Sequence, residues 1–292
     1  MSSTITAGAW PAYAGPQPAV SPWRGTMLVW RTEMRKLTRQ FWPRVGTVLC
    51  LLMPFGVAAV LRAQTSTPGD TLFGQWVHTS GFAIPMVILG FGGVFILPIM
   101  PAVVAGDIFS AEDHHGTWKT VLTRSRSRGE LFAGKFLTAL TFPVIMLVLV
   151  TISAVLAGYV CGTQPVVGVS GQLVPAGHAT WLVIASYLAE IPPMLAFTAL
   201  AMMASVVSRN TVVGMGTPVV LTLVLQVVTL ISLPAVVQVS MLSTPFLTWR
   251  GFWAQPAFFG PFEVGLIVSA AWFTVCSGVA WLVFRRRSMG VA

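Results

Sequence analysis

Six stretches of the sequence are apolar over the length that a helix needs to cross a bilayer, roughly 20 residues. They cover residues 45–62, 82–105, 134–161, 180–207, 211–232 and 263–284. Inside a membrane every backbone N–H and C=O group must find its hydrogen-bond partner within the chain, so isolated apolar segments of this length are predicted to be helices. The sequence therefore predicts an all-α integral membrane protein with six transmembrane helices.

The composition excludes a soluble domain. Hydrophobic residues make up 55% of the chain and charged residues 9%, whereas a soluble domain carries about 25% charged residues. The net charge of +9 would suggest nucleic acid as the partner of a soluble protein. Here the basic residues flank apolar spans, where they orient the helices and meet lipid headgroups. We expect membrane lipids as partners and no nucleic acid.

The cysteines and the known catalytic motifs point to no chemistry on this chain. Cys50, Cys161 and Cys276 fall within or at the edge of apolar spans and lack the spacing of metal ligands, so we expect buried thiols and no metal site. The chain also lacks a phosphate-binding G-x-x-x-x-G-K-[ST] sequence, a G-x-S-x-G elbow and an H-E-x-x-H pair. We expect that the protein is not an enzyme.

The distribution of lysine and arginine predicts the topology. With the N-terminus inside, fifteen of these residues fall in inner segments and two, Arg62 and Arg250, in outer ones. Basic residues concentrate on the cytoplasmic side of membrane proteins. Both termini and the connection between spans two and three are therefore predicted to be cytoplasmic.

The N-terminal region divides into two parts ahead of the transmembrane domain, which is assigned to residues 43–292. Residues 1–22 carry no charge and four prolines, which predicts a disordered tail. Residues 23–42 are predicted to form an amphipathic helix in the headgroup layer. Its apolar side repeats at steps of three and four, through Met27, Trp30, Met34, Leu37 and Phe41.

The connection at 107–135 is the most highly charged part of the chain, with nine charged residues. Two S-x-x-[DE] capping patterns, at Ser110 and at Ser127, predict a short helix that begins near Ser110 and a longer one that begins near Ser127. The neighbouring His114 and His115 are poor candidates for one metal ion, because adjacent helix positions point about 100° apart. We expect a polar docking surface on the cytoplasmic side.

The connection between spans five and six is unusually apolar. Residues 233–262 contain four prolines and many aromatic residues, which predicts a re-entrant or an interfacial segment. We expect its rings at the outer membrane interface: Phe246, Trp249, Phe252, Trp253, Phe258, Phe259 and Phe262.

Glu190 is the one acidic residue deep within a span, and Pro192 and Pro193 follow it. A carboxyl group at this depth is costly and is by default a functional hypothesis. The sequence leaves three roles open: contact with cargo, proton transfer, or a structural hydrogen bond to a neighbouring helix. As candidates for a translocation path we take Phe91, Glu190, Met215 and Gln226.

Two segments together resemble the membrane subunits of bacterial ABC exporters of the ABC-2 type. Residues 33–37, Glu-Met-Arg-Lys-Leu, are similar to the Glu-x-x-Lys-Leu of that family's N-terminal helix, and Glu112, Gly116-Thr117, Ser127-Arg128 and Gly134-Lys135 match its loop between spans two and three. The Gly-Thr-Trp-Lys sequence at 116–119 is most similar to that of the lantibiotic-immunity and bacitracin-type permeases. One departure is the absence of a proline in the basic turn, which here reads Arg124-Ser125-Arg126.

The resemblance implies that the chain is the permease of an ATP-driven exporter, which moves a hydrophobic or amphipathic compound such as an antibiotic, a peptide or a lipid. It also implies a role in drug efflux and antibiotic resistance. It places the chain in a bacterial plasma membrane, as a dimer with a second copy or a sister permease. The partners are two copies of an ABC ATPase, which carry ATP and Mg, while this chain holds no cofactor.

The same resemblance assigns two helices to the contact with the ATPase. The helix at 110–123 would be the coupling helix, which docks through Glu112, Asp113, His114, His115, Gly116 and Thr117. The helix at 23–42 would be the connecting helix, with Trp30, Glu33, Arg35 and Lys36 in the contact. Two alternatives to an exporter stay open: a proton-coupled secondary carrier that uses Glu190, and a membrane sensor subunit.

Overall fold

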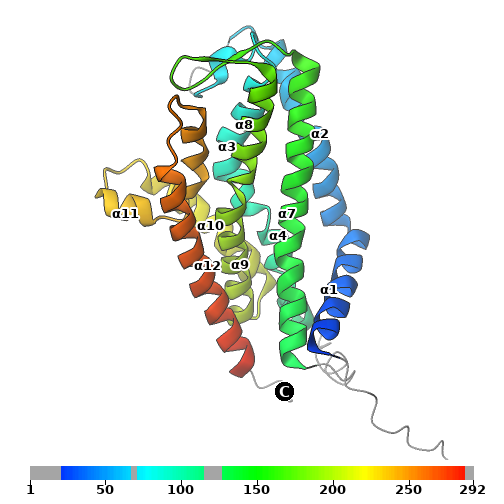
Figure 1. Ribbon diagram of the computed structural model, residues 1–292. Coiled ribbons are helices and arrows are strands. Elements are labelled where there is room, and N and C mark those ends of the chain that lie inside the picture. The colour runs from blue at the N-terminus through cyan, green and yellow to red at the C-terminus, as the bar shows by residue number, and fades with distance from the viewer. Residues whose placement is uncertain (1–20, 67–70, 115–126, 287–292) are drawn as a thin grey trace, which may run out of the picture.

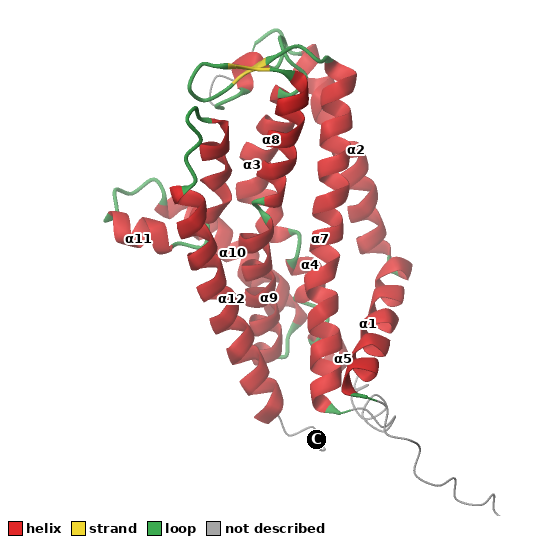
Figure 2. Ribbon diagram, in the orientation of Figure 1, coloured by secondary structure: helices red, strands yellow, loops and turns green. Residues whose placement is uncertain are grey.

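The protein is an elongated bundle of helices, described here from a computed structural model (Figure 1). The structure describes residues 21–66, 71–114 and 127–286. The tail predicted for residues 1–22 lies almost wholly outside the described residues. Figure 2 shows that nearly all of the described chain is helical, with one short pair of strands at one end of the bundle.

The helices and strands follow one another in a simple order. Their bounds are α1 Pro22–Arg39, α2 Phe41–Ala63, η1 Gly74–Trp76, α3 Ala83–Ile99, α4 Ala102–Ala105, α5 Ser110–His114, α7 Arg128–Cys161, β1 Val166–Val167, β2 Leu173–Val174, α8 Ala176–Leu188, α9 Ile191–Ser208, α10 Thr211–Val228, α11 Ala235–Ser240, η2 Thr244–Trp253 and α12 Gly260–Arg286. The two strands pair antiparallel, with Val166 opposite Val174. We call the end of the bundle that holds α1 and α5 the α1 end, and the end that holds the strands the opposite end (Figures 1 and 2).

Six helical segments in the described chain are long and apolar enough to cross a membrane, which confirms the prediction of an all-α protein with six spans. Four of them are single helices, α2, α7, α10 and α12. The second and fourth spans are interrupted. The second divides into α3, α4 and α5, with breaks after Ile99 and Ala105, and the fourth divides into α8 and α9 at Ala189 and Glu190.

The N-terminal helix differs from the sequence prediction in its end and in its buried face. It ends at Arg39, because Gln40 has an extended backbone (φ −75°, ψ 147°), and residues 41 and 42 therefore begin the first span. Its buried positions are Gly25, Val29, Glu33 and Leu37. Of the apolar residues predicted to share one side, Leu37 is buried, Met27, Trp30 and Met34 are half-buried and Phe41 is exposed, and α1 packs along α7.

The contact between α1 and α7 is a close one. A Cβ atom added at Gly134 of α7 would lie 2.5 Å from Cβ of Val29 on α1, so the small residue is what admits the neighbouring helix. The start of α7 carries the predicted capping box: the Glu130 amide donates to Ser127 Oγ at 3.2 Å, and the Ser127 amide donates to Glu130 Oε2 at 3.4 Å. The N-terminus of α7 is thereby fixed beside α1.

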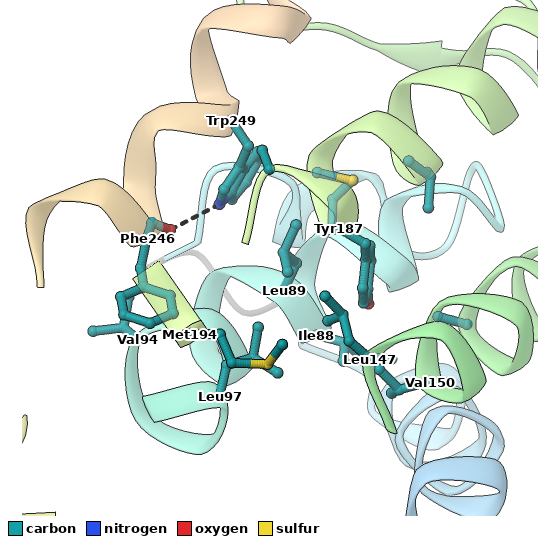
Figure 3. Packing of buried hydrophobic residues seen from close by; sticks show 14 of the residues in the cluster. Ile88, Leu89, Val94, Leu97, Leu147, Val150, Tyr187, Met194, Phe246 and Trp249 are labelled. Atoms are coloured by element: carbon teal, nitrogen blue, oxygen red, sulfur yellow. Dashed lines mark hydrogen bonds between the residues drawn. The ribbon is translucent and has the colours of Figure 1, made fainter. Parts of the chain in front are cut away.

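The largest hydrophobic cluster includes residues of α3, α8, α9 and η2 (Figure 3). Phe246, Trp249 and Trp253 of η2 are fully buried in it. The prediction that all of these rings lie at a membrane interface was therefore wrong for these three, because η2 folds back against α3, α8 and α12. Phe258 and Phe259 are exposed.

Helix α10 approaches the α4 segment so closely that only glycine fits. A Cβ added at Gly214 would lie 2.4 Å from the carbonyl oxygen of Gly106, and one added at Gly106 would lie 2.5 Å from the amide nitrogen of Met215. Two residues further along the same helix, a Cβ at Gly216 would meet nothing within 4 Å.

These distances give a matched pair of variants. We expect Gly214→Ala to lower the stability of the purified protein by about 1–3 kcal/mol, because the methyl group forces backbone atoms apart. Gly216→Ala should leave stability unchanged or slightly raised, since alanine favours the helix over glycine. The midpoint of unfolding, followed by tryptophan fluorescence in detergent, measures both. Equal midpoints for the two variants would show that α4 and α10 do not touch here.

Candidate functional site

Four charged side chains from three separate segments meet at the α1 end of the bundle. Glu33 and Lys36 come from α1, Glu112 from α5, and Lys135 from the first turns of α7. Figure 2 shows α1 and α5 beside the N-terminal end of α7, which we call the foot of α7. We call these four residues the ion-pair cluster.

Lys135 is the centre of the ion-pair cluster. Its side chain is 2% exposed, and its Nζ lies 3.0 Å from Glu33 Oε1, 3.3 Å from Glu112 Oε1 and 2.9 Å from the carbonyl oxygen of Ile108. An ammonium group has three N–H donors, so each can be used. A buried charge is tolerated only when it is paired and hydrogen-bonded. The buried position of Lys135 therefore depends on the contacts that α1 and the α5 segment make with it.

Lys36 closes the ion-pair cluster on its solvent side. It lies 3.1 Å from Glu33 Oε1 and 3.5 Å from Glu112 Oε1, and its side chain is about half exposed. Burial lowers the pKa of Lys36, but the carboxylates of Glu33 and Glu112 outweigh burial and raise that pKa above its usual value. A raised pKa in the folded state means that the pairing stabilises the protein at neutral pH and is lost only as the pH rises through the lysine range.

The α5 segment is held on its other side by α10. Ser110 Oγ donates to the carbonyl oxygen of Gly106 at 2.9 Å and lies 2.8 Å from Thr211 Oγ1. Thr211 in turn donates to Asp107 Oδ1 at 3.1 Å. Between the cluster and α10 lies a cavity of about 370 Å³, lined in part by Lys36, Asp107 and Met215.

The arrangement links α1, α5 and α7 through paired charges. Within residues 21–66, 71–114 and 127–286, no three His, Cys, Asp or Glu side chains are grouped so that they could hold a metal ion. The charges pair with each other across three segments that are far apart in sequence. Displacement of α5 must therefore either move α1 and the foot of α7 with it or break buried ion pairs.

The structure brings together part of the predicted contact surface. Glu33, Lys36 and Glu112 join the ion-pair cluster, and Trp30 donates its Nε1 hydrogen to Thr141 Oγ1 of α7 at 3.3 Å. Arg35 is exposed. Of the remaining predicted docking residues, Asp113 and His114 end α5, while His115, Gly116 and Thr117 lie outside the described residues.

Among the described residues, the four predicted to line a translocation path lie at different places in the bundle. Phe91 is exposed on α3, Glu190 is fully buried, and Met215 lines the cavity beside the ion-pair cluster. Gln226 is half-buried on α10.

Sequence reasoning did not include Lys135 among the site residues, although it is the residue on which the cluster depends. It entered only through the Gly134-Lys135 motif of the family resemblance. The available signal was its position: a lone lysine that continues into an apolar helix must be paired or reach the headgroups.

These features define a multi-pass α-helical membrane protein whose charged groups form a structural junction. Comparison with family models matches residues 29–228 to the family described as ABC-2 family transporter protein. The match spans more than half of the chain, and the protein belongs to this family. Comparison with curated proteins gives no match. Membership makes the chain a membrane transport component, itself not catalytic, and implies an ABC ATPase as its partner.

The ion-pair cluster predicts that its two lysines differ sharply in their importance. We expect Lys135→Met to destabilise the protein by about 3–5 kcal/mol, because it leaves two carboxylates without their buried partner. Lys36→Met should cost less than about 1 kcal/mol, because its pairing is exposed to water. Unfolding midpoints in the same detergent measure both variants.

A third variant separates lost charge pairing from lost packing. When Lys135→Met is combined with Glu33→Gln and Glu112→Gln, most of the stability should return, because no buried charge is left unpaired. If the triple variant is no more stable than Lys135→Met alone, the lysine stabilises the protein by packing and the ion pairs are incidental.

Proposed function

We propose that the chain is the permease subunit of an ATP-driven exporter of the ABC-2 type, which moves a hydrophobic or amphipathic compound, such as an antibiotic, a peptide or a lipid, out of the cell. ATP and Mg are bound by the separate ATPase. The observation that carries the proposal is the ion-pair cluster, because it ties α5 to α1 and to the third span through buried charges.

The cluster supports a specific way of transmitting motion. The segment that begins with α5 would rest on the ATPase, and closure of two ATPase subunits would push it. Breaking the contacts of Lys135 is expensive because charges in a buried site must stay paired. The push would therefore move α5, α1 and the foot of α7 as one unit, and the full length of α7 would carry the motion towards the opposite end (Figure 1).

The charge distribution supports the orientation of this unit. Fifteen of the seventeen lysines and arginines fall in segments that the six-span topology places on one side, and the ion-pair cluster lies on that side. We place the α1 end and both termini in the cytoplasm of a bacterial cell, with the strands and η2 facing outward.

The exposed apolar helices support an assembly of two permeases, either two copies of this chain or this chain with a sister permease. Phe91, Phe95 and Ile96 form an exposed apolar strip on α3, and α10 exposes a further row of apolar side chains. Some of this surface faces lipid. We propose that the strip on α3 and the face of α10 meet those of the second permease and line the cargo path between them.

The proposed docking predicts a site-specific loss of coupling. We expect Gly116→Trp to abolish or strongly reduce co-purification of the ABC ATPase subunit, because the large ring blocks docking after α5. Gly177→Trp is the matched control, since a Cβ at Gly177, near the opposite end, meets nothing within 4 Å. Pull-down from mild detergent and ATP hydrolysis by the reconstituted complex measure the effect.

A different outcome would redirect the assignment. If both tryptophan variants retain the ATPase equally, docking does not use this segment. If the wild-type chain binds no ATPase and moves compounds in vesicles that contain a pH gradient and no ATP, the protein is a proton-coupled carrier. Glu190→Gln should then abolish that flux.

A further inference from the structure

Arg250 of η2 is a cation that the described part of the chain does not neutralise. The ion pairs among the described residues are those of the ion-pair cluster, and none of them includes Arg250. The other basic residue of the segments predicted to face outward, Arg62, donates to the carbonyl oxygen of Cys161. Burial lowers the pKa of Arg250, so its guanidinium group has lost part of its water shell. An anion from outside the described chain would compensate for that loss.

The indole ring of Trp249 fixes the position of this guanidinium group. Cζ of Arg250 lies 5.9 Å from the centre of the ring, within the range of a cation–π contact. Trp249 is 1% exposed, and its Nε1 donates to the carbonyl oxygen of Phe246 at 3.1 Å (Figure 3). The ring also packs on Phe73, with 6.3 Å between the two ring centres. The charge is therefore held on a rigid support, which reduces the entropy that a ligand must give up on binding.

Arg250 and several apolar side chains line one cavity of about 110 Å³, which we call the Arg250 cavity. Its apolar wall includes Phe73, Met86 and Phe91, and Arg250 is the only charged side chain among the described residues that line it. A water molecule takes up about 30 Å³ in the liquid, so the cavity has room for a small anionic group. Because Arg250 and Phe91 line the same cavity, one compound can contact both of them.

Phe91 also connects the Arg250 cavity to the apolar strip on α3. The side chains of Phe91, Phe95 and Ile96 are 52%, 42% and 49% exposed. Residues four positions apart lie on one face of a helix, so Phe95 continues the surface that begins at Phe91. Gly90 lines the cavity as well, and a Cβ added there would meet nothing within 4 Å. A chain attached to the anionic group can therefore leave the cavity over Phe91 and lie along the strip.

We infer that the Arg250 cavity binds an anionic amphiphile, with its phosphate or carboxylate group on Arg250 and its apolar chain on Phe91. A guanidinium group donates paired hydrogen bonds to either anion. An inorganic anion would leave the apolar wall uncovered, and an uncharged compound would leave the cation without a partner. The site lies near the opposite end of the bundle, away from the ion-pair cluster, and the inference goes beyond the proposed function. Two sources have this chemistry: a phospholipid of the membrane, and a single-chain compound that is transported.

Three compounds separate the contribution of the charge from that of the chain. Hexyl phosphate carries both, 1-hexanol carries only the chain, and inorganic phosphate carries only the charge. Equilibrium dialysis against the full chain in uncharged maltoside micelles, with empty micelles subtracted, gives the dissociation constants. We expect hexyl phosphate to bind about tenfold more tightly than either of the others, because it gains a charge-assisted contact and apolar burial together.

Variants of the two arginines locate the preference for the anion. Arg250→Gln should remove the difference between hexyl phosphate and 1-hexanol. Arg62→Gln is the matched control and should retain the difference, because the Arg62 guanidinium group already has a partner in the chain. Asp70 lies outside the described residues and is tested in the same way. Tighter binding of hexyl phosphate by Asp70→Asn would show that Arg250 has a carboxylate partner within the chain, and would overturn the inference.

A second pair of variants tests the cavity itself and covers the case in which Arg250→Gln does not fold. Gly90→Leu should weaken the binding of hexyl phosphate about tenfold, because its side chain takes the place of the ligand. Gly177→Leu should leave binding unchanged, since a Cβ there also meets nothing within 4 Å and Gly177 does not line the cavity. Equal binding of hexyl phosphate and 1-hexanol by the wild-type chain, an unchanged preference in Arg250→Gln, or unchanged binding in Gly90→Leu would each overturn the inference.

Competition with a lipid identifies the source of the amphiphile. If phosphatidylglycerol displaces hexyl phosphate at about one lipid per chain, the site is occupied by a membrane lipid. If only single-chain phosphates bind, the site belongs to a transported compound; both results support the inference. None of these experiments needs an ATPase, so their failure leaves the docking result untouched, and a failed docking experiment leaves the binding result standing.

Discussion

The ammonium group of Lys135 is the interaction on which the α1 end of the molecule depends. It is buried, and oxygen atoms from α1, from α5 and from the turn before α5 surround it. Each of those segments alone is short or exposed, and none has a core of its own. One buried cation thus contacts three segments, of which α1 is separated from Lys135 by 102 residues and α5 by 23 residues.

The six spans could be predicted from sequence because the bilayer demands them. Apolar length and the need to bond every backbone group within the segment leave the helix as the only choice, and the capping box at Ser127 fixes where the third span begins. The buried face of α1 could not be predicted in the same way. The periodicity of apolar residues identifies the most hydrophobic face of a helix. Glu33 nevertheless faces the bundle, because its partner Lys135 lies there, and that partner is 102 residues away in the sequence.

The burial of η2 was missed for a related reason. A segment of aromatic residues between two spans has the same composition whether its rings lie at the membrane interface or fold back into the bundle. Composition therefore does not distinguish these cases. The fold decides between them, because Phe246, Trp249 and Trp253 pack into the hydrophobic cluster that α3, α8 and α9 also form. Figure 3 shows Phe246 and Trp249 in this cluster. At the site, likewise, the residue types were visible in the sequence, while the cluster that joins them was not.

Lys135 and Glu190 are both buried, and burying a charged or polar group costs free energy unless it has a partner. The lysine is satisfied fully by the chain, so its burial makes a rigid junction and leaves nothing for a ligand to add. Neither carboxyl oxygen of Glu190 has a hydrogen-bond partner among the described residues, and the missing side chain of Gly93 on α3 leaves room for the carboxyl group. A chain that needed Glu190 only for packing would lose little by replacing it with an apolar residue of similar size. The two residues are therefore opposite cases: the chain supplies every partner of Lys135, whereas Glu190 has no hydrogen-bond partner among the described residues.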